Sequence, residues 1–275
     1  MIIDTHHHYW NYNPVEFDWI NDEMDSIRKS FLPSDLKETL DVARVDGVVT
    51  VQARQCIEET DWLLEMTAEN EFMHGVVGWL PLADDNVNGL LESYSTNKWL
   101  KGVRHVVQSE PDSEFILGKE FNKGVSLLKT YNLVYDILIF ERQLPNTILF
   151  VDRHPGQQFV LDHIAKPKII DNELDTWAKN LKELSKRENV SCKISGMVTE
   201  ADFKSWNEQQ LQPYFDVVLE AFGPERLLFG SDWPVCMVAT SYADWLRLVK
   251  EVTSKLSKTE QELIFHKNAE RIYNL

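Results

Sequence analysis

The feature that most constrains the fold of this chain is a regular alternation of short apolar runs with amphipathic, helix-like segments. Eight runs can be traced, and helical spacing of apolar residues follows each of them. The runs are almost continuously hydrophobic, as strands of a parallel sheet that is buried on both faces must be. They cover residues 1–5, 45–53, 75–80, 100–107, 133–140, 159–163, 190–195 and 227–234.

Eight strand–helix repeats in 275 residues predict an α/β protein that forms a single (β/α)8 TIM barrel over residues 1–275. A doubly wound open sheet is the alternative, and it is less favoured because no glycine-rich phosphate loop follows the first run. The aromatic-rich segment from Tyr9 to about Ser34 is long for a connection, so we expect a functional lid or binding loop there.

Composition limits the binding partners and the cellular compartment that we expect for this protein. The formal net charge of −16 argues against nucleic acid or an anionic membrane as a binding partner. The three cysteines, Cys56, Cys192 and Cys236, are widely spaced, form no CxxC motif and are expected to be reduced. The sequence shows no signal peptide and no run near the ~20 apolar residues of a membrane helix, so a cytoplasmic location is expected.

The first run ends in three consecutive histidines. Side chains alternate along a strand, so His6 and His8 should point to one face and His7 to the other. Two neutral imidazoles on one face can hold a divalent cation. An N-terminal strand with incidental histidines is the competing interpretation, and a leftover tag is unlikely because the run lies inside an apolar strand that leads into Trp10.

Polar side chains recur where the other runs end, and in a TIM barrel these ends form the active-site face. They are Arg54, Trp79, Arg104, His105, Asp136, His163, Lys193, Ser195 and Asp232. Several of these residues also have a structural interpretation. His163 could be a hydrogen-bonded core residue, Asp232 could cap a turn, and the two arginines could pair with acidic side chains. At most one of Arg104 and His105 should point inward, Asp162 should diverge from His163, and Lys193 can face outward toward the helices.

Taken together, His6, His8, His163 and Asp232 should converge at the barrel mouth. Three imidazoles and one carboxylate suit Zn²⁺ or a similar borderline cation. We therefore predict one divalent metal, most simply Zn²⁺, bound by these four residues.

The motifs also resemble those of the amidohydrolase superfamily, in particular amidohydrolase-related family two and its branch of sugar-acid lactonases, which act on fucono- and rhamnonolactones. The resemblance spans nearly the whole chain, and its motifs occur in the family's order. They are Asp4-Thr5-His6-His7-His8-Tyr9-Trp10, Lys101-Gly102-Val103-Arg104-His105, Phe159-Val160-Leu161-Asp162-His163 with Lys166-Pro167, Lys193-Ile194-Ser195-Gly196, and Phe229-Gly230-Ser231-Asp232-Trp233-Pro234.

The resemblance implies hydrolysis of a sugar lactone to the aldonic acid, with Asp232 as general base. The family's two-metal members carry a bridging Lys or Glu on strand four and a histidine on strand five. This chain lacks both, which implies at most one metal. A related lactonase works without metal, and two models for the partner of the carbonyl oxygen therefore stay open. A metal could polarise it, or His163 with Arg104 or Arg54 could donate hydrogen bonds to it.

Further residues are predicted to contact the substrate. Arg54 could attract the product carboxylate, His105 could bind the substrate, and Trp10, Trp79 and Trp233 could stack on the sugar, although Trp79 is equally suited to the core. A homodimer is an option that the sequence leaves open.

Two other functions compete with lactone hydrolysis: a metal-dependent decarboxylase of the same superfamily, and a non-catalytic barrel that acts as a binding protein. Clustered ionisable residues at strand ends weigh against the second.

Overall fold

A computed structural model describes all 275 residues of the chain. Its framework is one sheet of eight parallel strands whose order in space is their order in the sequence. The predicted (β/α)8 barrel is therefore confirmed. The strands are β1 (Ile3–His7), β2 (Gly47–Val51), β3 (Met73–Gly78), β4 (Leu100–Val106), β5 (Val134–Leu138), β6 (Phe159–Leu161), β7 (Val190–Ile194) and β8 (Leu227–Phe229).

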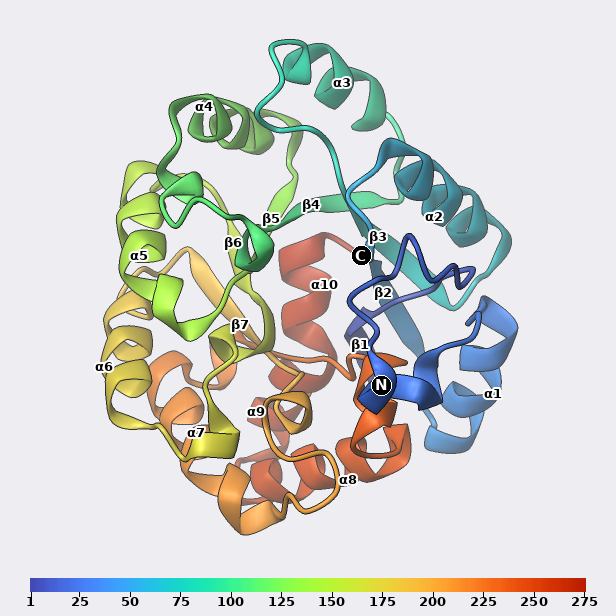
Figure 1. The fold of residues 1–275 in the computed structure, drawn as a ribbon, viewed down its shortest axis with the longest axis vertical. Coiled ribbons are helices and arrows are strands. Elements are labelled where there is room, and N and C mark those ends of the chain that lie inside the picture. The colour runs from blue at the N-terminus through green and yellow to red at the C-terminus, as the bar shows by residue number, and fades with distance from the viewer.

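Helices surround the sheet as an outer ring, which Figure 1 shows from one end. The helices are α1 (Pro33–Ala43), α2 (Ile57–Glu69), α3 (Val87–Tyr94), α4 (Lys119–Leu128), α5 (Leu144–Arg153), α6 (Asp175–Leu184), α7 (Glu208–Phe222), α8 (Tyr242–Val252), α9 (Lys258–Glu262) and α10 (Asn268–Tyr273). Helices α1 to α7 connect consecutive strands, because parallel neighbours need a crossover that returns the chain to the same edge, and α8, α9 and α10 follow the last strand.

The last helix, α10, lies at the centre of the ring rather than on its rim (Figure 1). Its residues Ala269, Ile272 and Tyr273 are buried in one apolar cluster with inward-facing strand residues. That cluster also contains Ile3, the first residue of β1, so α10 covers the end of the barrel where the strands begin. The opposite end, where the strands finish, is left for a functional site.

Two strands end before the polar residue that closes their apolar run. The runs extend to 163 and 234, but β6 ends at Leu161 and β8 ends at Phe229. His163 and Asp232 therefore lie on loops just past their strands. Loop residues can adopt backbone conformations that a strand forbids, and both residues do, with φ of 53° and 59°.

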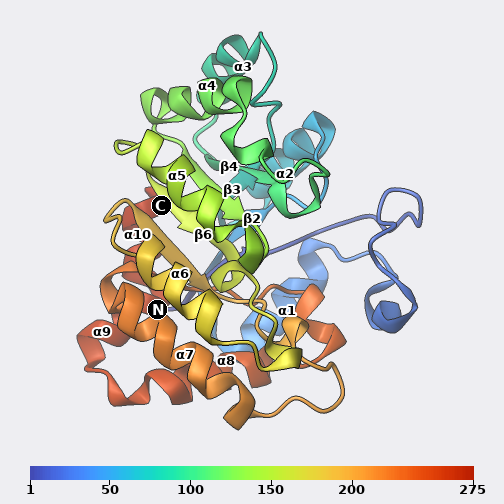
Figure 2. The same ribbon diagram turned by 60° about the vertical axis from the view of Figure 1, so that its left-hand side comes forward.

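The connection from β1 to α1 projects from the barrel as a long excursion (Figure 2). Backbone hydrogen bonds between Trp10 and Phe31, of 3.1 and 2.9 Å, close its base. It contains one short 3₁₀ helix, η1 (Asp22–Ile27), and otherwise irregular structure. Among the helices, none combines the length and the hydrophobicity that a bilayer crossing requires.

Candidate active site at the barrel mouth

Backbone hydrogen bonds that close the barrel bring the two ends of the sequence together at the mouth. The Asp232 N–H donates to the His6 carbonyl and the His8 N–H donates to the Trp233 carbonyl, each at 2.7 Å. The buried carboxylate of Asp4 ties the same segments, because it accepts from the N–H groups of His6 and Ser231 at 3.0 and 2.9 Å. Burial raises the pKa of Asp4 to about 6. The closure fixes Asp232 beside the first strand.

The imidazoles of His6 and His8 face each other, as alternation along a strand predicted. Their Nε2 atoms are 3.2 Å apart, whereas His7 points away and contacts the Thr50 hydroxyl through Nε2 at 2.9 Å. The Nδ1–H of His8 donates to the Val51 carbonyl at 2.8 Å, which leaves the Nε2 lone pair of His8 free. Asp232 Oδ1 lies 3.8, 3.5 and 3.9 Å from the Nε2 atoms of His6, His8 and His163, respectively.

These distances suit a shared cation. The donor atoms of His6, His8 and Asp232 all lie within 4.8 Å of one another, and so do those of His6, Asp162 and His163. Two ligands that bind a tetrahedral zinc at about 2.0–2.1 Å lie about 3.3 Å apart. The 3.2 Å between His6 Nε2 and His8 Nε2 matches that spacing. His6 belongs to both groups, so the chain offers a His/Asp group that can hold a metal ion.

His163 is held in place by an unusual turn. Four consecutive residues from His163 to Lys166 have left-handed backbone angles, with φ of 53°, 50°, 64° and 47°. Such conformations cost free energy for residues other than glycine and concentrate at functional sites. Gly196 makes room for the turn: it has φ of 62°, and a Cβ there would lie 2.5 Å from His163 Nδ1. The Nδ1 of His163 is within 2.9 Å of the Ser195 hydroxyl.

Beneath the imidazoles lies a buried network of charges. Arg104 Nη1 donates to Asp162 Oδ2 at 2.9 Å and lies 3.3 Å from His6 Nε2. Lys193 forms an ion pair with Asp136 and lies 3.0 Å from Asp162 Oδ1 and 3.2 Å from His6 Nδ1. The Tyr273 hydroxyl of α10 donates to Asp136 at 2.9 Å. Two cations and two anions therefore balance inside the barrel.

The network sets the protonation of its neighbours. Burial, reinforced by the charge of Lys193, lowers the pKa of His6 well below its usual value, and burial with His6 does the same for His163. Burial alone would raise the pKa of Asp162, but Lys193 and Arg104 hold it below the ordinary value. The imidazoles are thus neutral near pH 7, which is the form that binds metals and accepts protons.

A cavity of about 260 Å³ opens above this cluster. Four predicted site residues line it: His8, Arg104, His163 and Asp232. His6 lies just behind them, fully buried. The cavity wall also contains Lys166 of the Lys166-Pro167 motif, to which the sequence assigned no role, and residues that the sequence did not single out, among them Asp18, Trp19, Gln108 and Ser109. Asp18 and Trp19 come from the β1–α1 excursion, as expected for a binding loop.

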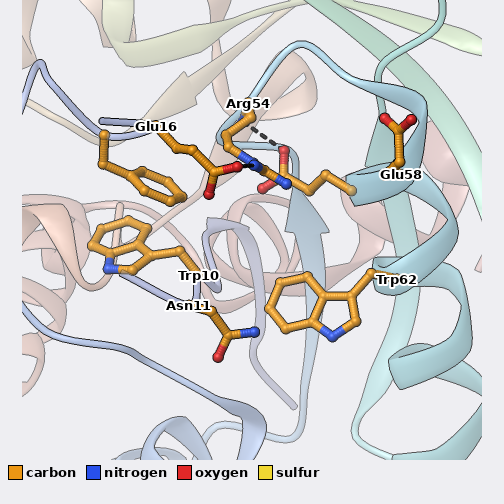
Figure 3. A pocket seen from close by; sticks show the side chains of 8 residues that line it. Trp10, Asn11, Glu16, Arg54, Glu58 and Trp62 are labelled. Carbon is orange, nitrogen blue, oxygen red and sulfur yellow. Dashed lines mark hydrogen bonds and ion pairs between the residues drawn. The ribbon is translucent and has the colours of Figure 1, made fainter. Parts of the chain in front are cut away.

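Arg54 and Trp10 line a different pocket, of about 160 Å³, which Figure 3 shows. Arg54 forms an ion pair with Glu16, and its guanidinium lies 5.9 Å from the centre of the Phe17 ring. The Arg54 N–H donates to buried Glu59 at 2.5 Å, and burial raises the pKa of Glu59 to about 7. Arg54 therefore fastens the excursion to the barrel immediately before the residues that reach the mouth cavity.

The other predicted substrate contacts also lie outside the lining of the mouth cavity. Trp79 Nε1 donates to His105 Nδ1 at 3.3 Å, and His105 Nε2 is 2.6 Å from Glu110. Trp233 is buried against Phe31, with ring centres 5.2 Å apart. The predicted contacts of Arg54, His105, Trp10, Trp79 and Trp233 with substrate stay predictions. As expected from alternation, Arg104 points into the barrel and His105 does not.

Comparison with known proteins was made on the whole chain. A family model described as amidohydrolase matches residues 3–275. The chain belongs to the amidohydrolase family. It is 36% identical to an L-fucono-1,5-lactonase from Burkholderia multivorans, over 99% of this chain and 96% of that protein. Identity to an L-fucono-1,5-lactonase from Burkholderia ambifaria is 30%, with 99% and 95% covered.

Among solved structures, this amidohydrolase is similar to a crystal structure of an amidohydrolase from Burkholderia multivorans with bound zinc. The TM-score is 0.97 at 36% identity, and the match covers 100% of this chain and 99% of that one. The family resemblance that the motifs indicated is confirmed.

Two expectations about this amidohydrolase's interior were wrong. Lys193 does not face the helices but is fully buried among the charges inside the barrel. Asp162 does not diverge from His163: both lie in one group with His6, and Asp162 Oδ1 is 3.3 Å from His6 Nδ1. One signal in the sequence pointed this way: single charges of opposite sign, Asp136 and Lys193, interrupt apolar strands that need both faces buried.

Replacing Lys193 tests the buried network. Lys193→Met would leave Asp136 and Asp162 without their shared cation, and the free energy of unfolding should fall by about 3–5 kcal/mol. Lys182→Met removes an exposed lysine that pairs with Glu220 at 2.7 Å, and it should cost less than about 1 kcal/mol. Urea denaturation of both variants measures the difference. Equal stabilities would contradict the network's role.

Replacing Arg54 tests its attachment of the excursion. The pair with Glu16 is partly exposed, so Arg54→Met should change global stability by less than about 1 kcal/mol. Amide hydrogens of residues 11–20 should nevertheless exchange faster, while those of α2 do not. Arg247→Met, which breaks a surface pair with Glu208, is the control. Unchanged exchange over 11–20 would show that apolar contacts alone hold the loop.

Proposed function

We propose that this amidohydrolase opens a sugar lactone to the aldonic acid, with Asp232 as the general base. The observation that carries the proposal is the position of the Asp232 carboxylate, within 3.9 Å of three imidazole nitrogens on the floor of the mouth cavity. The full-length likeness to two L-fucono-1,5-lactonases supports the choice of substrate class. The decarboxylase alternative draws no support from these relatives.

In the proposed reaction, a water molecule beside Asp232 attacks the lactone carbonyl carbon while Asp232 takes its proton. The carbonyl electron pair moves onto oxygen and then returns, and the bond to the ring oxygen breaks. Asp232 gives its proton to that departing oxygen, which becomes a hydroxyl group. A well-placed general base of this kind contributes roughly 10²–10⁴-fold to the rate.

A single divalent metal, most simply Zn²⁺, would be held by His6, His8 and Asp232 with His163. Bound there, it would supply Lewis acidity for the carbonyl oxygen or the water. The chain's own residues prepare this site: the Val51 carbonyl orients His8 through Nδ1, and the Ser195 hydroxyl contacts Nδ1 of His163. Lys193 Nζ and Asp162 Oδ1 lie 3.2 and 3.3 Å from His6 Nδ1. Arg104, 3.3 Å from His6 Nε2, is the cation that would take part in a reaction without metal.

The role of Asp232 is tested by a substitution that keeps its shape. Asp232→Asn should lower kcat by about 10²–10⁴-fold on fucono- and rhamnonolactones, because the amide cannot accept the proton of water. KM should change much less. Asp171→Asn, at an exposed position outside the cavity, is the control. Full activity of Asp232→Asn would contradict the assignment of the base.

Chelation separates the two models for the carbonyl oxygen. The metal model predicts that protein treated with a chelator loses activity and that stoichiometric Zn²⁺ restores it. The metal-free model predicts no loss on chelation and a loss of about 10²-fold or more in Arg104→Met. The measurement is lactone turnover by the same preparation before chelation, after it and after the addition of metal.

A further inference from the structure

Lys166 is the cation in the mouth cavity whose hydrogen-bonding capacity is left for a ligand. An ammonium group has three donors. The nearest carboxylate oxygen, Glu200 Oε1, is 3.7 Å from Lys166 Nζ, beyond a hydrogen bond of normal length. Arg104, the other cation of the cavity wall, already donates to Asp162 and Gln52 through its terminal nitrogens and lies 3.3 Å from His6 Nε2. A ligand would therefore meet free donors on Lys166.

The backbone holds Lys166 firmly toward the cavity. It is the last residue of the left-handed turn that begins at His163, and its N–H donates to the His163 carbonyl at 2.8 Å. Its side chain, only 18% exposed, passes the Phe140 ring, whose centre is 5.7 Å from Nζ. His163 and Lys166 thus lie at the two ends of one turn that a backbone hydrogen bond closes.

Lactone hydrolysis creates negative charge twice at one place. The carbonyl oxygen becomes negative when water adds, and the product then carries a carboxylate. The cavity wall contains two acidic residues, Asp18 and Asp232, and the chain has a net charge of −16. A growing anion in this setting needs a donor fixed in position, since preorganised donors stabilise developing charge best.

We propose that Lys166 is a catalytic residue, whose ammonium binds the lactone's carbonyl oxygen during hydrolysis and then holds the product carboxylate. This inference rests on the proposed lactonase function. Lys166 stays protonated throughout. The new bond joins the water oxygen to the carbonyl carbon, the carbonyl pair moves onto the oxygen beside Lys166, and its return breaks the ring ester bond. The proton that Asp232 removed from water goes to the departing ring oxygen. The carboxylic acid so formed releases its remaining proton to solvent, which gives the carboxylate that Lys166 holds.

The competing interpretation is structural: Lys166 only pairs with Glu200, both side chains being about one-fifth exposed, at 18% and 19%. The two roles differ in what they do to charged and uncharged ligands. A structural lysine would affect the binding of all ligands through a displaced His163. An anion-binding lysine would affect the aldonate and leave an uncharged alditol with the same hydroxyl groups almost unaffected.

The test compares Lys166→Met with Lys168→Met. Lys168 lies two residues further along, is 48% exposed on its side chain, pairs with Glu141 and Glu173, and does not line the cavity. We expect kcat on fucono- or rhamnonolactone to fall about 10²-fold in Lys166→Met and to stay near wild type in Lys168→Met. The dissociation constant of the product aldonate should rise about tenfold, as loss of a charged hydrogen bond predicts, with little change for the alditol.

Two further variants keep the result decisive. Lys166→Arg retains the charge and should recover part of kcat. Glu200→Gln removes the neighbouring carboxylate and should tighten aldonate binding, even if Lys166→Met fails to fold. Equal losses for aldonate and alditol, or wild-type behaviour of Lys166→Met, would overturn the proposal.

Failure of the proposed function can be told apart from failure of this inference. If the wild-type protein turned over no lactone, the lactonase proposal would fall. Calorimetric binding of aldonate against alditol would still report whether Lys166 is the anion-binding group. If lactones are hydrolysed but aldonate binding ignores Lys166, only the inference about Lys166 fails.

Discussion

The site depends on how the barrel closes. The segment after β8 pairs with β1 through two backbone hydrogen bonds of 2.7 Å, from Asp232 to His6 and from His8 to Trp233. Backbone bonds are short and directional, so they fix the position of a side chain far better than contacts between flexible groups do. Residues more than two hundred positions apart in the sequence, His6 and His8 on one side and Asp232 on the other, are thereby held within 3.8 Å of one another. The same closure that stabilises the sheet assembles the chemistry.

The barrel interior contains a layer of four buried charged side chains next to its apolar layer. Isolated charges would be too costly to bury, but Lys193 and Arg104 offset Asp136 and Asp162 at close range. Burial, together with the charge of Lys193, holds the pKa of His6 well below its usual value, and Asp162 Oδ1 lies 3.3 Å from its Nδ1. Tyr273 links it to the helix that covers the far end of the barrel. The same buried ion pairs therefore stabilise the barrel interior and help to set the protonation of the imidazoles above them.

Much of this could be predicted from the sequence, because it follows from periodicity. Eight apolar runs specify the barrel, and alternation along β1 correctly put His6 and His8 on one face. Prediction was weaker where periodicity stops. His163 and Asp232 lie past the ends of their strands in left-handed conformations that no spacing rule anticipates. Periodicity also did not place Lys193 inside the barrel, because lysines usually face solvent and its charged partners lie on other strands. Nor could it show that Arg54 pairs with Glu16, which lies on an irregular loop.

The most direct test of the account is a crystal structure with the aldonic acid product bound. We predict that the carboxylate lies in the mouth cavity, within hydrogen-bond distance of Lys166 Nζ and beside Asp232 and His163, with the sugar chain toward Trp19. Product bound instead in the pocket lined by Trp10 and Arg54, or at the mouth with its carboxylate turned away from Asp232, would contradict this prediction.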